Sequence, residues 1–199
     1  MNGWLSTNTA VPSRILLIGQ APGPREGDFG RPFAWTAGKQ LFKWTASIGL
    51  DEPGVRGRVY MAAICRCFPG KTKQGGDRVP SPDEVAACAP WLDREIAVLG
   101  PRLVIPVGKL AIEALFTGKA ALTEVVGRSH RGERAGRAFD LIPLPHPSGA
   151  STWWKMEPGA TLLARALGLV ARHDAWREVV AAPPPAHRAP DPVARPPRK

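Results

Sequence analysis

One histidine of this sequence lies in a rigid loop that directly follows an apolar run. The run Leu141–Leu144 leads into Pro145–Gly149, where His146 stands between two prolines. Such a run is typical of a buried strand, and a histidine can donate or accept a proton near neutral pH. The pattern indicates a site for hydrogen bonding or proton transfer, although a loop histidine bonded to backbone would give the same pattern.

A second loop of similar construction lies far upstream. Gly19–Gly23 follows the apolar run Ile15–Ile18, and its two glycines and its proline leave the backbone tight and uncovered. A flat ligand could approach this backbone closely, and Phe33, which follows Gly30–Pro32, could supply an aromatic face. The alternative is an ordinary strand-to-helix turn with a core phenylalanine.

The elements around these loops predict how they are positioned. Apolar runs suited to strands alternate with segments of helical periodicity, which predicts a three-layer α/β/α fold with a central four-stranded parallel sheet. The carboxyl ends of parallel strands meet at one edge, so the two loops should face each other across a cleft. The predicted strands are residues 14–18, 59–64, 103–107 and 139–144, and the predicted helices are residues 37–48, 81–99, 109–116 and 160–180.

Composition sets the domain organisation and the class of partner. The chain has 199 residues, of which 44% are hydrophobic, enough for one domain with a core. We expect a flexible arm over residues 1–13, the domain over 14–182, and a disordered Pro/Arg-rich tail over 183–199. The formal net charge of +10 suits a polyanion such as DNA, although part of the excess lies in the tail.

The sequence also bears on location and redox state. No apolar run approaches the roughly 20 residues that span a bilayer, and the first 13 residues lack the features of a signal peptide. We therefore expect a cytoplasmic monomer with no membrane partner. The three cysteines fit a reducing compartment without a disulfide framework.

The two loops, in this order, resemble the two motifs of the uracil-DNA glycosylase superfamily. Gly19–Gly23 resembles the first motif and His146–Ser148 the second, and the spacing to Gly30–Phe33 is similar to that of the iron–sulfur branch, family 4. The resemblance runs from about Arg14 to near Val180. It implies an enzyme that flips uracil out of DNA and hydrolyses its N-glycosidic bond, leaving an abasic site and free uracil for base-excision repair.

The resemblance also implies roles for single residues. His146 would donate a hydrogen bond to uracil O2 as charge develops there, and Phe33 would stack on the flipped base. Gln20 or Glu26 would position the attacking water. The remaining residues expected around the base are Gly19, Ala21, Pro22, Gly23 and Ala63.

Two regions are expected to contact the DNA backbone or groove. The second motif and the loop after it contribute Ser148, Gly149, Ser151 and Trp153, and the basic segments contribute Lys71, Lys73, Arg128 and Arg131. Trp153 or Trp154 could fill the gap left by the base, as apolar wedges do, or both could pack against the last helix. The basic loop Phe68–Pro80, which carries Lys71 and Lys73, could likewise be only a solvated connection.

The sequence departs from its relatives at the positions that read the base and activate water. Where the superfamily often has an asparagine, this chain has Ala62 or Ala63, which implies backbone reading or a broader specificity that includes hypoxanthine and xanthine. The best-studied branch has an aspartate at the position of Ala21. Glu26 matches an acid of family 4, and Gln20 could position water without deprotonating it.

A third departure concerns the iron–sulfur cluster, which families 4 and 5 bind through four cysteines. Cys67 and Cys88 resemble two of these ligands, but the amino-terminal Cys-x-x-Cys is missing and Cys65 cannot complete the set. We therefore predict no metal and no cofactor.

A binding protein that captures uracil-DNA or the abasic site with little turnover is the alternative from another class. One branch of the superfamily bonds covalently to the sugar through a histidine in an inserted basic loop. The corresponding loop here, Gly70–Val79, has no histidine, and His130 is the spare candidate.

Overall fold

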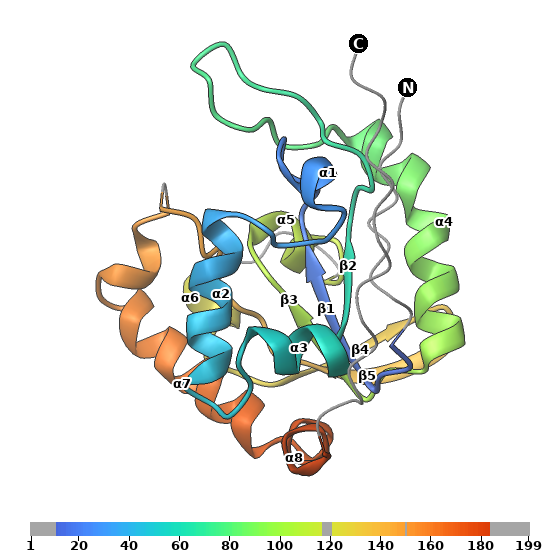
Figure 1. The fold of residues 1–199 in the computed structure, drawn as a ribbon, viewed down its shortest axis with the longest axis vertical. Helices are drawn as coiled ribbons and strands as arrows, with labels where there is room; N and C mark the ends of the chain where they lie inside the picture. The colour runs from blue at the N-terminus through green and yellow to red at the C-terminus, as the bar shows by residue number, and fades with distance from the viewer. Residues whose placement is uncertain (1–10, 117–120, 150, 184–199) are drawn as a thin grey trace.

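The computed structural model of the chain describes residues 11–116, 121–149 and 151–183 (Figure 1). Residues 1–10 of the predicted arm and residues 184–199 of the predicted tail lie outside the described residues.

A five-stranded sheet forms the centre of the molecule, with the strand order β2-β1-β3-β5-β4. Four neighbouring strands are parallel, which confirms the predicted parallel sheet. These strands are β1 (Ile15–Gly19), β2 (Tyr60–Ala63), β3 (Leu103–Pro106) and β5 (Arg137–Leu141).

The fifth strand, β4 (His130–Arg134), was not predicted from the sequence. It runs antiparallel to β5 at the edge of the sheet, and the two-residue turn Ala135–Gly136 joins them. Both turn residues have positive φ, 52° and 69°, the geometry that suits tight hairpins. An edge strand can be charged, so β4 lacks the apolar run that identified the other strands.

Helices cover both faces of the sheet. Most of the predicted helices are present, and the short α1, α3 and α6 were not predicted. The helices are α1 (Glu26–Phe29), α2 (Thr36–Ala46), α3 (Glu52–Arg58), α4 (Pro82–Leu99), α5 (Lys109–Glu113), α6 (Leu122–Val125), α7 (Gly159–Arg172) and α8 (Asp174–Ala181). No helix within the described ranges is long and apolar enough to cross a membrane.

The prediction of a single helix over 160–180 was wrong, because the chain turns at His173 between α7 and α8. His173 has an extended backbone, and its ring Nδ1 accepts a hydrogen bond from the Ala175 N–H at 3.1 Å. This side chain caps the start of α8, so the apolar periodicity continues while the helix direction changes.

Alternate residues of β1 bury their side chains in two separate cores. Ile15 and Leu17 belong to the core that also contains residues of α2, α7 and α8, while Leu16 and Ile18 belong to the core under α4. Figure 1 shows α2 and α7 on one side of the sheet and α4 on the other. This alternation follows from the two-residue period of a strand and produces the three-layer arrangement.

The replacement Trp176→Ala should lower the free energy of unfolding by about 3–5 kcal/mol, the usual loss for a large buried aromatic residue. Trp176 is only 1% exposed, and its indole N–H donates to the Ile48 carbonyl at 2.9 Å. Urea unfolding followed by circular dichroism measures the change. Trp91→Ala is the control, because Trp91 is 50% exposed and should cost less than about 1 kcal/mol. Equal losses in the two variants would contradict the packing described for α8.

Candidate active site

The two predicted loops meet at the carboxyl ends of the parallel strands, where they line one pocket of about 450 Å³. Phe33 and His146 therefore share a cavity, as the sequence predicted. All residues predicted to contact or act on the base line this pocket, namely Gly19, Gln20, Ala21, Pro22, Gly23, Glu26, Phe33, Ala63 and His146, together with Ser148 from the predicted DNA contacts.

Two glycines at the ends of neighbouring strands leave room for the two rings. A methyl group on Gly19, at the end of β1, would lie 2.8 Å from Cζ of Phe33. A methyl group on Gly108, just after β3, would lie 2.9 Å from Cδ2 of His146. Both distances are shorter than carbon atoms tolerate, so only glycine allows these rings to pack against the strand ends.

The backbone of Phe33 is strained and is fixed by Arg56. Phe33 has φ of 53°, in the left-handed region that a bulky residue rarely adopts. Arg56 of α3 donates to the carbonyl of Pro32 at 3.0 Å and to that of Phe33 at 3.3 Å, and Glu52 accepts from its Nε at 2.8 Å. The ring of Phe33 packs on the core and also lines the pocket, so the two roles considered for it are compatible.

Glu26 lines the pocket but is bonded to the backbone of the loop that carries Phe33. It accepts a hydrogen bond from the Gly23 N–H at 3.2 Å. Burial raises the pKa of Glu26 above its ordinary value, although the backbone N–H groups of Gly23, Phe33 and Ala34 oppose this. Its carboxylate oxygens therefore serve first to fix the loop.

A hydrogen bond to His146 determines which nitrogen of its ring carries the proton. The Ser148 N–H donates to Nδ1 of His146 at 3.3 Å, so Nδ1 is an acceptor and the proton of the neutral ring lies on Nε2. Burial lowers the pKa of His146, and the charge of Asp77 only partly opposes this. The ring is therefore a neutral donor at pH 7.

Comparison of the sequence with known proteins identifies the family of the chain. The family model of the uracil DNA glycosylase superfamily matches residues 7–168, most of the chain. The chain belongs to this superfamily. The type-4 uracil-DNA glycosylase of Sulfurisphaera tokodaii is 30% identical over 158 residues, covering 74% of this chain and 68% of that protein.

Two further relatives are a type-4 and a type-5 uracil-DNA glycosylase. The type-4 uracil-DNA glycosylase of Pyrobaculum aerophilum is 33% identical over 67% of this chain and 66% of that protein. The type-5 uracil-DNA glycosylase of Thermus thermophilus is 38% identical, but over only 52% of this chain and 50% of its own length. The predicted relationship to families 4 and 5 is confirmed.

Sequence reasoning missed an aromatic surface beside the glycosylase pocket. Trp35 and Phe29 are 42% and 43% exposed, and their rings stack with centroids 6.1 Å apart. The guanidinium carbon of Arg25 lies 4.4 Å from the centre of the Trp35 ring. Arg25 and Trp35 both line the pocket, so a cationic and aromatic surface adjoins it. The signal was the pair of aromatic residues that flank Phe33 in the sequence.

Several predicted DNA contacts lie outside the pocket lining. Lys71 and Lys73 are exposed on the loop between β2 and α4, which extends beyond the sheet on the same side as α1 (Figure 1). Arg128 is exposed before β4, and Gly149 is exposed after the second motif. The Ser151 N–H donates to the Ser148 carbonyl at 3.1 Å, which tightens that loop.

Trp153 takes the packing position rather than a free wedge position. It begins a short 3-10 helix, Trp153–Lys155, and packs against the main core. A methyl group on Gly159, in α7, would lie 2.0 Å from the Trp153 carbonyl and 2.9 Å from its ring. The structure thus favours the second of the two alternatives for this residue.

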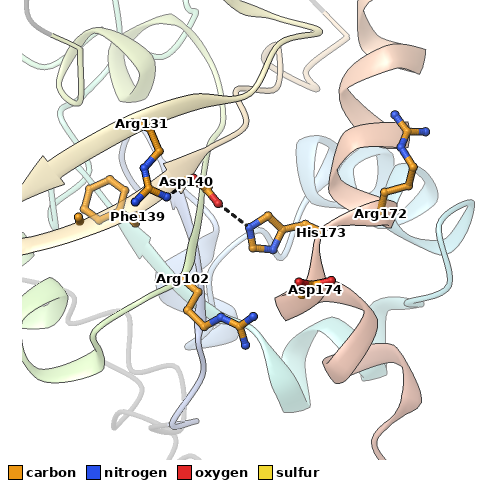
Figure 2. A pocket seen from close by; sticks show the side chains of 8 residues that line it. Arg102, Arg131, Phe139, Asp140, Arg172, His173 and Asp174 are labelled. Atoms are coloured by element: carbon orange, nitrogen blue, oxygen red, sulfur yellow. Dashed lines mark hydrogen bonds and ion pairs between the residues drawn. The ribbon is translucent and has the colours of Figure 1, made fainter.

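Arg131 lines a different hollow, shown in Figure 2. Its guanidinium donates to Asp140 at 2.6 Å, and His173 bonds the other oxygen of that carboxylate at 3.1 Å. Asp140 pairs in register with Leu103, at the start of β3, so this hollow lies toward the opposite end of the strands. Burial raises the pKa of Asp140, but hydrogen bonds from Arg131 and His173 hold it below its ordinary value. The place of Arg131 gives no support to its predicted contact with DNA.

The cysteines do not fit the four-thiolate cluster of families 4 and 5. The chain has three cysteines, and Cys65 is buried beside Cys88 while Cys67 is exposed. Burial and the neighbouring Cys88 raise the pKa of Cys65 to about 12, so its thiol is protonated. Within the part of the chain that the structure describes, no three His, Cys, Asp or Glu side chains are placed to hold a metal. No step of the chemistry below passes through a cluster.

The protonation state of His146 can be measured directly. Because its pKa is lowered from 6.5, the ring should stay neutral as the pH falls from 8 to 6.5 and should gain a proton only below that value. Long-range ¹⁵N–¹H correlation spectra should show the Nε2–H tautomer at pH 7. An imidazolium at pH 7, or the Nδ1–H tautomer, would contradict the hydrogen bond from Ser148.

Proposed function

We propose that the pocket receives a uracil extruded from DNA and that the protein hydrolyses its N-glycosidic bond, leaving abasic-site DNA and free uracil. Membership of the superfamily gives the enzyme class, a DNA glycosylase of base-excision repair that acts on uracil-containing DNA. The observation that supports the proposal most is the shared pocket of Phe33 and the neutral His146.

His146 acts on the leaving base. When the bond from C1′ to the base breaks, the electron pair leaves with the uracil ring and negative charge develops on O2. A fixed N–H donor in a partly dry pocket stabilises that charge without reorganising. Nε2 of His146 is such a donor because Ser148 holds Nδ1 as the acceptor. The ring of Phe33 stacks on the face of the same base.

The pocket supports a specificity broader than uracil as a second candidate. Ala62 and Ala63 lie at the end of β2, so no side-chain amide reads the base from that strand. Among the lining residues that the structure describes, Gln20 carries the one side-chain amide. An amide both donates and accepts, so Gln20 can read uracil, but a single such group rejects other deaminated bases less strictly.

Covalent capture finds less support than hydrolysis. His130, the spare candidate, bonds the Val125 carbonyl through Nε2 at 3.0 Å and packs edge-on against Phe116. It does not line the pocket. We keep the prediction that the protein acts as a monomer, because one chain supplies every group named in the chemistry.

The variant His146→Ala should slow release of uracil by about 10²–10³-fold, the usual loss for one such donor. Strands that contain uracil, hypoxanthine or xanthine are incubated with enzyme, treated with alkali and resolved on a denaturing gel. The control His130→Ala should stay within about threefold of wild type. Wild-type cleavage by His146→Ala would remove His146 from the mechanism.

The same gels separate the alternatives. Cleavage of the hypoxanthine or xanthine strand at a rate near that of the uracil strand would establish the broader specificity. A shifted band that survives SDS, with no cleavage after alkali, would instead establish capture of the sugar.

The variant Trp35→Ala should weaken binding to DNA by about 5- to 150-fold, because stacking of one base on an aromatic ring contributes about 1–3 kcal/mol. Fluorescence anisotropy with abasic-site DNA measures the dissociation constant at a fixed salt concentration. The control is Trp91→Ala, which removes an equally exposed indole from α4, outside the pocket lining. Equal affinity in the two variants would show that the surface beside the pocket does not contact DNA.

A further inference from the structure

Among the described residues, two carboxylates line the pocket, and one of them is hydrogen-bonded to backbone. Glu26 is bonded to the backbone of the loop that carries Phe33. The other is Asp77, which the motifs did not identify. Its carboxylate has no ion-pair or hydrogen-bond partner among the described residues, so its oxygens are free to bind a water molecule.

Asp77 belongs to a hairpin with a defined backbone. Lys71 and Asp77 form a β-bridge, and the Thr72 N–H donates to the Gly76 carbonyl at 2.7 Å. The Arg78 N–H donates to the Gly70 carbonyl at 2.9 Å, which closes the base of the hairpin. These bonds fix the position of the Asp77 backbone even though its side chain is exposed.

The next residue fixes the hairpin to the body of the molecule. Arg78 donates through Nε to the Pro69 carbonyl at 2.9 Å and through Nη2 to Glu84 at 2.7 Å. Glu84 also accepts the Ser81 N–H at 2.7 Å in the capping box of α4. The start of α4 therefore holds the segment that carries Asp77 over the pocket.

The carboxylate of Asp77 lies close to both functional loops. A methyl group on Gly23, in the first motif, would lie 3.9 Å from Oδ2 of Asp77. The charge of Asp77 also acts on the His146 ring, whose pKa it raises against the larger effect of burial. A carboxylate and a neutral imidazole thus line one cavity, and hydrolysis of an N-glycosidic bond can use the first to activate water and the second to stabilise the leaving base.

We propose that the Asp77 carboxylate is the general base that orients and deprotonates the attacking water and that its negative charge stabilises the cationic sugar. The inference rests on the proposed hydrolysis and names the group that the first motif lacks, since Ala21 and Gln20 cannot accept a proton there.

The step balances as a hydrolysis. The bond from C1′ to N1 of uracil breaks, and its electron pair leaves with the base, whose O2 is held by His146 Nε2–H. A lone pair of water forms the new bond to C1′, and the water proton passes to the Asp77 carboxylate. Asp77 returns that proton to solvent, and the uracil anion takes one from solvent.

Single-turnover kinetics with the full-length chain and an excess of enzyme tests the inference. Asp77→Asn should lower the rate of uracil release by about 10²-fold or more, the scale of a lost general base. Asp77→Glu, which keeps the carboxylate, should recover part of that loss. The matched control is Asp83→Asn, an equal charge change on an exposed aspartate outside the pocket, which should stay within about twofold.

A binding measurement separates chemistry from affinity. Asp77→Asn should bind abasic-site DNA at least as tightly as wild type, because it removes a negative charge that faces phosphates. A wild-type rate at saturating enzyme, or a loss confined to affinity, would overturn the role of Asp77 and leave the hydrolysis standing. If the wild-type protein releases no base, the proposed function fails and this inference fails with it.

Discussion

The close packing of two rings against two glycines is the constraint on which the site depends. Gly19 ends β1 and Gly108 follows β3, and these neighbouring parallel strands place their ends side by side. Phe33 contacts the first glycine and His146 the second. A side chain at either glycine would clash with the neighbouring ring, so the strand ends as well as the loops determine where the two rings lie.

The surrounding residues keep the two rings in conformations that they would not adopt alone. The left-handed backbone conformation of Phe33 costs free energy. The hydrogen bonds of Arg56 and Glu26 to the backbone of its loop offset that strain. The Ser148 N–H fixes the tautomer of His146 in the same way. The charged and titratable residues near the pocket therefore fall into two groups. Glu26 and Arg56 hold the loop of Phe33, whereas the Nε2–H group of His146 is left for the reaction.

The basic side chains of the hollow around Asp140 and those beside the pocket differ in their partners. In the hollow around Asp140, Arg131 and His173 both bond to the Asp140 carboxylate, and Arg102 pairs with Glu178 at 2.7 Å. At the pocket, by contrast, exposed lysines of the hairpin and the Arg25–Trp35 pair face outward. These basic side chains near the pocket would favour association with DNA through phosphate contacts.

The sequence by itself determined the four parallel strands, the helix α4, whose start at Ser81 carries a capping sequence, and the two loops of the pocket. Each of these leaves a local signal, because buried strands need apolar runs, a helix start needs a cap, and close contact with a ring needs glycine. Edge strand β4 left no such signal, since its residues are charged and partly exposed.

Only the tertiary structure decided which polar residues reach the pocket. Glu26 and Asp77 look alike in sequence as loop acids, yet Glu26 is bonded to backbone, and Asp77 lines the pocket together with His146 from a distant hairpin. Arg131 and Lys71 look alike as basic residues, yet Arg131 pairs with Asp140 elsewhere. Trp153 packs closely against Gly159 of α7 and is not free to enter DNA. The place of Asp77 in the pocket depends on segments far apart in the chain, whereas the contacts of Glu26, Arg131 and Trp153 depend on how neighbouring segments fold back on one another. The residue types alone encode neither kind of contact.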